Sequence, residues 1–152
     1  MISGSDGSRL HRRLIDALYV EAMLLADEAR SYFDEAGRTE REALGPLARV
    51  GFSCESLKVT TRLMHVIAWL LTQRAVQDGE LRPSEARHPS RLLGEAPPSD
   101  AGVLATLPDR ARALVASSAD LHRRVALLDT AEGAAATRSP ARSMQERLAR
   151  AF

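Results

Sequence analysis

Residues Phe52–Val76, FSCESLKVTTRLMHVIAWLLTQRAV, form the most apolar stretch of the chain and decide its fold. Apolar side chains recur there in one row at spacings of three, four and seven residues: Leu57, Met64, Ala68, Leu71 and Ala75. A second row adjoins the first: Leu63, Val66, Ile67 and Leu70. A helix that is apolar over most of its girth has to be covered by several neighbours, whereas a surface helix needs only one stripe. The stretch therefore predicts the central helix of a bundle.

Two further helices are predicted on either side of this one. Apolar residues recur at helical spacing from Leu10, so we expect a first helix over residues 9–36, capped by Ser8 and stopped at Gly37. Pro46 suits the first turn of the central helix, which is expected over 46–78. Within it, Gly51 could mark a kink or Ser53 could restart the helix.

The third helix is expected over residues 107–130, because its apolar positions alternate spacings of four and three. That row is Leu107, Ala111, Leu114, Ser118, Leu121, Val125 and Leu128. Between the second and third helices, prolines and glycines predict a long loop over about 80–103. The predicted organisation is a flexible N-terminus (1–8), an all-α three-helix bundle (9–131) and a flexible C-terminal tail (132–152).

The composition is that of a globular helical protein. Of 152 residues, 45% are hydrophobic and only 4% aromatic, while the net charge is +1. So small a charge provides no general attraction to nucleic acid or acidic membranes. A single cysteine excludes an intrachain disulfide, as expected in a reducing compartment, and we expect a cytoplasmic protein with no membrane span.

No pattern of catalytic, metal-binding or cofactor-binding residues is recognisable. Cys54 and His65 are eleven residues apart on one helix, which separates them by about 16 Å, too far to share a metal ion. Cys54 is predicted to be a small buried hydrophobe, because the sequence provides it with neither a general base nor an oxyanion site. We therefore expect no enzyme activity and no cofactor.

Two groups of residues are candidates for protein binding. Lys58, Arg62, His65 and Trp69 lie along one flank of the central helix, here called the basic strip. Trp and Arg are enriched at interface hot spots, although Trp69 could equally pack beneath a neighbouring helix with the cations at its edge. In the tail, Met144, Leu148 and Phe152 share one face of a short helix that could become ordered on a partner.

Residues 46–76 followed by Gly79-Glu80 resemble the core motif of the regulator-of-CtrA-degradation (RcdA) family of alphaproteobacteria. The resemblance extends over most of residues 10–130 and implies a three-helix bundle that dimerises. It also implies a non-enzymatic adaptor that works with other adaptors to deliver clients such as CtrA to the ClpXP protease, at a cell pole. The surplus apolar surface of the central helix independently favours a homodimer, because two flanking helices cannot cover all of it.

A DNA-associated regulator of the cell cycle or of transcription is the alternative. Nucleic acid is the less favoured partner, since Arg110, Arg112, Arg123 and Arg124 alternate with acidic residues and so resemble a solvated helix face.

Overall fold

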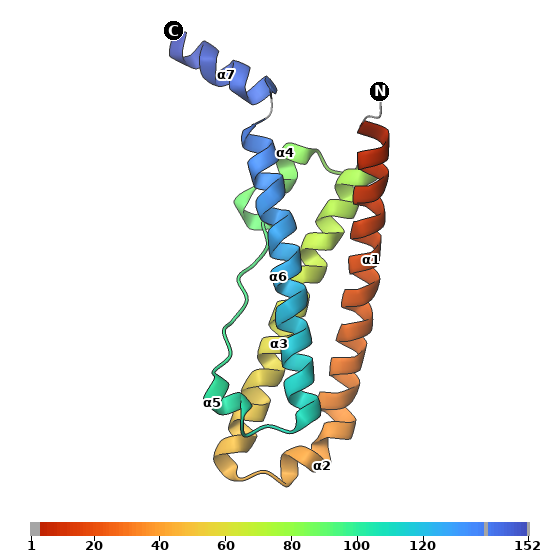
Figure 1. Ribbon diagram of the computed structural model, residues 1–152, viewed down its shortest axis with the longest axis vertical. Coiled ribbons are helices and arrows are strands. Elements are labelled where there is room, and N and C mark those ends of the chain that lie inside the picture. The colour runs from red at the N-terminus through yellow and green to blue at the C-terminus, as the bar shows by residue number, and fades with distance from the viewer. Residues whose placement is uncertain (1–3, 139, 152) are drawn as a thin grey trace.

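Three long helices form the body of the protein in a computed structural model that describes residues 4–138 and 140–151 (Figure 1). In chain order the elements are α1 (Gly4–Ser31), the π-helical turn η1 (Tyr32–Ala36), α2 (Gly37–Glu42), α3 (Pro46–Gln77), α4 (Pro83–Ala86), the 3-10 turn η2 (Pro89–Arg91), α5 (Ala101–Leu104), α6 (Asp109–Thr137) and α7 (Pro140–Ala151). These ranges contain no strand. The predicted all-α class with three long helices is confirmed.

The direction of the helices explains the long connection between α3 and α6. Figure 1 shows α1 running antiparallel to α3, whereas α3 and α6 run in parallel. Since α3 has 32 residues and is therefore about 48 Å long, the chain must travel back along the bundle before α6 can start. Residues 78–108, the connecting segment, make this return, and residues 93–100 do so without helix or strand.

The core lies between the facing sides of the three long helices. The buried apolar residues of α1 are Ile15, Leu18, Ala22 and Ala29. Those of α3 are Phe52, Val59, Leu63, Val66, Trp69 and Leu70. The apolar row predicted for the third helix is buried from Leu107, just before α6, to Val125 within it. Ser118, the polar member of this row, is buried as well. The second apolar row of the central helix thus lies in the core, while Leu57, Met64 and Leu71 of the first row are exposed.

The first helical segment is longer at both ends than the sequence indicated. It begins at Gly4, so Ser8 lies inside α1 instead of capping it. The chain does not stop at Gly37, because the wider turn η1 leads directly into α2, which ends at Glu42. Buried Tyr32 stabilises this passage: its ring contacts Phe33 and its hydroxyl donates a hydrogen bond to Glu40.

The central helix is continuous from Pro46 to Gln77, so it does not restart at Ser53. Gly45 precedes the helix in an extended conformation, and Pro46 occupies the first turn. A Cβ atom at Gly51 would lie 2.9 Å from Cγ1 of Val103, so glycine allows α5 to pack closely against α3.

The C-terminal region differs from the predicted tail. Helix α6 continues to Thr137, seven residues beyond its expected end at 130, and α7 follows at Pro140. Figure 1 shows α7 projecting from the end of the bundle beyond α6. The flexibility of this region remains a prediction. No helix in the described part of the chain combines the length and apolar character of a membrane span.

Candidate interaction surfaces

The predicted basic strip lies on the flank of α3 that faces α6, beneath the connecting segment. Arg62 and Trp69 are each only 2% exposed, while Lys58 and His65 are half-buried. The expectation of an open partner-binding strip is therefore corrected, because the chain's own connecting segment covers it. Binding of another protein at the same side chains remains a prediction that would require this segment to move away.

Arg62 is the centre of a buried polar network. Its Nη2 donates hydrogen bonds to the carbonyl oxygen of Pro97 and to Oγ of Ser99, both at 2.7 Å, and Nη1 donates to Ser118 Oγ at 3.3 Å. The Ser99 hydroxyl in turn donates to Glu55 Oε2 at 2.6 Å. Burial lowers the pKa of Arg62 below its usual value, and the Glu55 carboxylate opposes this only in part. Because an arginine side chain stays protonated in proteins, Arg62 is a cation that joins the connecting segment to α3 and α6.

Two histidines hold the next part of the connecting segment. His65 Nδ1 lies 2.9 Å from the carbonyl oxygen of Glu95, and His122 Nε2 lies 2.8 Å from that of Gly94. A carbonyl oxygen only accepts, so both ring nitrogens must donate. A Cβ atom at Gly94 would lie 2.6 Å from the His65 ring, which leaves space for glycine alone.

Trp69 anchors the far end of the same flank. Its Nε1 donates a hydrogen bond to Asp129 Oδ1 at 3.0 Å, and Arg87 Nη1 donates to the same oxygen at 2.8 Å. Arg87 follows α4, so this pair of bonds fixes the start of the connecting segment to α6. The indole thus packs inside the bundle, which is the alternative that the sequence left open for it.

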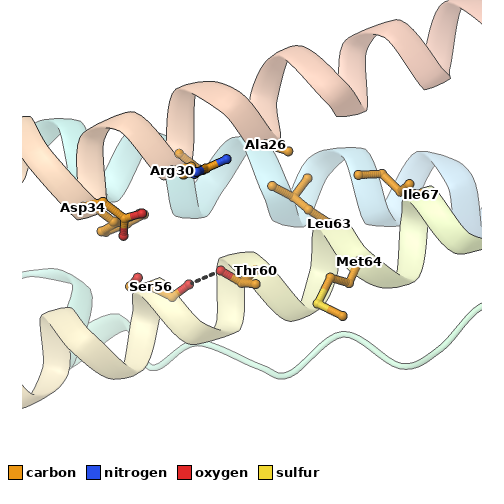
Figure 2. Close-up of a pocket in the computed structure, with 10 residues that line it drawn as sticks. Ala26, Arg30, Asp34, Ser56, Thr60, Leu63, Met64 and Ile67 are labelled. Atoms are coloured by element: carbon orange, nitrogen blue, oxygen red, sulfur yellow. Dashed lines mark hydrogen bonds between the residues drawn. The ribbon is translucent and has the colours of Figure 1, made fainter.

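The opposite flank of α3 has a different character. Between α1 and α3 lies a groove of about 340 Å³ (Figure 2). Figure 2 shows Ala26, Arg30 and Asp34 on one side and the α3 residues Ser56, Thr60 and Met64 on the other. Leu63, Ile67, Ala29 and Phe33 complete an apolar floor. No element of the connecting segment lines this groove.

On its exposed side α3 presents an apolar row with a strict seven-residue spacing: Val50, Leu57, Met64 and Leu71. Met64 of this row also lines the groove. Leu57 is 68% exposed and Met64 is 63% exposed. On α1, the exposed side chain of Met23 lies one turn before Ala26. Exposed apolar side chains that share one face of a helix make this side of α3 a candidate for contact with another protein. Val50 was not part of the predicted set, although its heptad spacing to Leu57 was visible in the sequence.

On the third face of the bundle, an ion pair joins α1 to α6. Arg124 forms ion pairs with Glu21 of α1 and with Asp120 on its own helix, and these carboxylates raise its pKa. Arg112 and Arg123 are paired with Asp109 and Asp120. Arg110 instead lies over the Tyr32 ring, 5.1 Å from its centroid. Three of the four arginines are thus balanced by nearby carboxylates, unlike those of a nucleic-acid footprint.

Helix α7 carries the predicted tail residues. Met144 and Leu148 are both exposed and lie one turn apart on the same face of the helix. Phe152 lies outside the described residues. A helix of 12 residues is marginally stable alone, so an apolar face on α7 is suited to packing on a partner.

The chemistry of the site is that of contact surfaces. Cys54 is exposed, contrary to the predicted buried position, because it lies on the outward side of α3. Among residues 4–138 and 140–151, no three side chains of His, Cys, Asp or Glu converge as metal ligands would.

Comparison with known proteins relates the chain to one family. The family described as "Protein of unknown function (DUF1465)" matches residues 7–152. The crystal structure of RcdA from Caulobacter crescentus CB15 is similar with a TM-score of 0.64 and 35% sequence identity, over 78% of this chain and 90% of that chain. No protein of curated function matches the chain. Neither similarity indicates a family of enzymes.

Proposed function

The chain belongs to the RcdA family, and on this premise we propose that it is a non-enzymatic adaptor for regulated proteolysis. It helps to deliver cell-cycle regulators such as CtrA to the ClpXP protease, together with other adaptors. It acts in the cytoplasm and is recruited to a cell pole. The observation that carries the proposal is the 35% identity to RcdA over most of both chains.

The arrangement of exposed apolar surface supports an adaptor. One such surface is the exposed row on α3, and a second is the face of α7 that bears Met144 and Leu148. They lie on different elements, so the row can pack against a second copy while the apolar face of α7 on each copy stays available for another protein. An adaptor that holds a client near a protease raises its effective concentration there without any chemistry of its own.

We assign the exposed row to a homodimer. A two-fold dimer uses the same patch on both copies, so a long row with regular spacing on one helix can pack against its own copy. Four apolar positions at seven-residue spacing are typical of helices that pack nearly side by side. The groove between α1 and α3 offers space of about 340 Å³ for side chains of the second copy.

The adaptor role is tested by degradation of purified CtrA by ClpXP in the presence of the other adaptors, with and without the full chain. The wild-type chain is expected to accelerate degradation, and Leu148→Asp to remove much of this acceleration because it places a charge on the apolar face of α7. Ala149→Asp introduces the same charge at a neighbouring exposed position and is expected to behave as wild type. No acceleration by the wild-type chain would contradict the proposal. An unaffected Leu148→Asp variant would remove α7 from the mechanism.

A further inference from the structure

A second cavity, of about 780 Å³, lies at the end of the bundle where α3 and α6 meet α4. Its walls include the apolar side chains of Val76, Pro83, Ala86 and Ala135. Cavities that bind ligands usually measure roughly 300–1,000 Å³ and combine apolar walls with a few polar groups. This cavity is of that kind, and neither the exposed row nor α7's apolar face contributes to it.

The polar groups that line the cavity converge on one carboxylate. The side chain of Glu132 on α6 is only 25% exposed. Burial raises the pKa of Glu132 to about 7; Arg87 lowers it, Asp129 raises it, and a hydrogen bond from Gln73 lowers it. A carboxylate in such a place lacks the hydration that would stabilise its charge. It therefore gains more from a bound cation than an exposed carboxylate does.

The nearby cationic groups balance the negative charge of Glu132 only in part. Arg87, the nearest guanidinium, donates its hydrogen bond to Asp129 at 2.8 Å, so its charge is already shared with another carboxylate. His11 Nε2 lies 3.4 Å from Glu132 and balances it only when the imidazole is protonated. The cavity thus contains a carboxylate, Glu132, whose negative charge is only partly balanced by neighbouring cations and which lies beside apolar side chains.

We infer that this cavity binds a basic side chain of a partner polypeptide, with the guanidinium or ammonium group paired to Glu132. The alkyl stem of an arginine or lysine would pack against Val76, Pro83 and Ala86, as such stems do along apolar surfaces. The cavity is larger than one side chain requires, and Ser84 and Gln145 on its walls can hydrogen-bond the adjoining peptide backbone. These features favour a peptide segment over a free small cation.

Binding is expected to strengthen as the pH rises from 6 to 8. A bound cation pairs with the ionised form of Glu132, which predominates only above its pKa of about 7. The groups that face Glu132 are His11 from α1, Gln73 from α3, Arg87 beyond α4 and Asp129 on α6.

The test is a titration of the full chain with the peptide acetyl-Ala-Ala-Arg-Ala-Ala-amide, followed by amide chemical shifts in solution. Shifts are expected in residues 83–87 and 129–136. A peptide with citrulline, the neutral isostere of arginine, is expected to bind about tenfold or more weakly, as is the arginine peptide to Glu132→Gln. Glu42→Gln, an exposed change at the opposite end of the bundle, is expected to bind as wild type.

Three results would overturn the inference: no shifts in these residues, equal binding of the arginine and citrulline peptides, or unchanged binding by Glu132→Gln. Arginine amide that binds as tightly as the peptide would assign the site to a free small cation instead. The inference stands apart from the adaptor role, since this titration contains neither protease nor client. A failed degradation assay would leave it untouched.

Discussion

The two flanks of α3 are covered in opposite ways. On the flank towards α6, the connecting segment covers the charged residues Arg62 and Glu55, which are nearly fully buried. On the flank towards α1, the apolar side chains of Leu57 and Met64 are more than half exposed. On these two flanks of α3, the usual arrangement of apolar residues inside and charges outside is thus reversed.

Topology accounts for the difference. Because α3 and α6 are parallel, a segment without regular structure must return between them, and its carbonyl groups need hydrogen-bond donors once they are buried. Arg62, His65 and His122 supply those donors. Helices α1 and α3 are antiparallel and need only a short connection at one end. Among the residues that the structure describes, only those of α1, η1 and α3 line the groove between them. A second protein can cover it instead.

The largest effect is expected from Arg62→Ala, which removes the centre of the covered flank. It would leave the Pro97 carbonyl and the Ser99 and Ser118 hydroxyls without their buried donor, while Glu55 keeps its ion pair with Lys58 at 3.1 Å. Each buried polar group left without a partner costs about 1–3 kcal/mol, so a total loss of about 3–5 kcal/mol is expected. The measurement is the free energy of unfolding by urea. Arg49→Ala changes the same residue type at an exposed position of the same helix and is expected to cost about 0.5 kcal/mol or less. Equal losses for both variants would mean that the buried network does not hold the segment.

A smaller effect is expected from Gly94→Ala. The added methyl group would press on the His65 ring, and overpacking of this kind costs about 1–3 kcal/mol. In a double-mutant cycle, the variant with both Gly94→Ala and His65→Ala should lose less unfolding free energy than the sum of the losses of the two single variants. Gly7→Ala serves as control, because a Cβ atom there meets nothing within 4 Å and alanine favours helix. Additive losses at residues 94 and 65 would contradict the close contact.

Glu132 provides a still smaller effect that depends on pH. Its pKa is raised from 4.5 to about 7 in the folded chain, so the stability that protonation provides is complete below pH 4.5 and is lost as the pH rises through 7. Glu132→Gln should therefore be more stable than wild type at pH 8, by about 1 kcal/mol, with the difference shrinking towards pH 5. Unfolding at several pH values measures this. Parallel pH profiles for the two proteins would show that the carboxyl is not perturbed.

The sequence predicted the helices of the bundle but not the surface that the connecting segment covers. The apolar girth of the central helix predicted a bundle and surplus apolar surface, because periodicity is a local property of the chain. The burial of Trp69 was one of two alternatives that the sequence left open. The burial of Arg62 was not predictable, since it depends on Pro97 and Ser99, which belong to a segment with no periodic pattern. The sequence showed a loop there but not the surface on which it lies.

The end of the first helix was predicted wrongly because Gly37 was taken as a stop. Gly37 continues the helical path because its missing side chain makes room for Tyr32, whose atoms would lie as close as 2.8 Å from a Cβ atom. Gly133 lies inside α6, where a Cβ atom would lie 2.8 Å from Nη2 of Arg87. In both places glycine serves a tertiary contact, and no local rule could have revealed this.

The central claim is that the flank of α3 with the exposed row binds a second copy of the chain. Substitution of Met64, which is 63% exposed, should change the free energy of unfolding of one chain by only about 0.5 kcal/mol. Substitution of Met64 by aspartate should instead weaken the association of two chains. Leu127→Asp on α6, where the side chain is equally exposed, provides the matched control.

The most direct measurement is the mass in solution by light scattering at tens of micromolar protein. The wild-type chain and Leu127→Asp are expected at twice the 16.6 kDa of one chain, and Met64→Asp at the mass of a single chain. A wild-type mass of 16.6 kDa would contradict the claim, as would a Met64→Asp variant that remains a dimer.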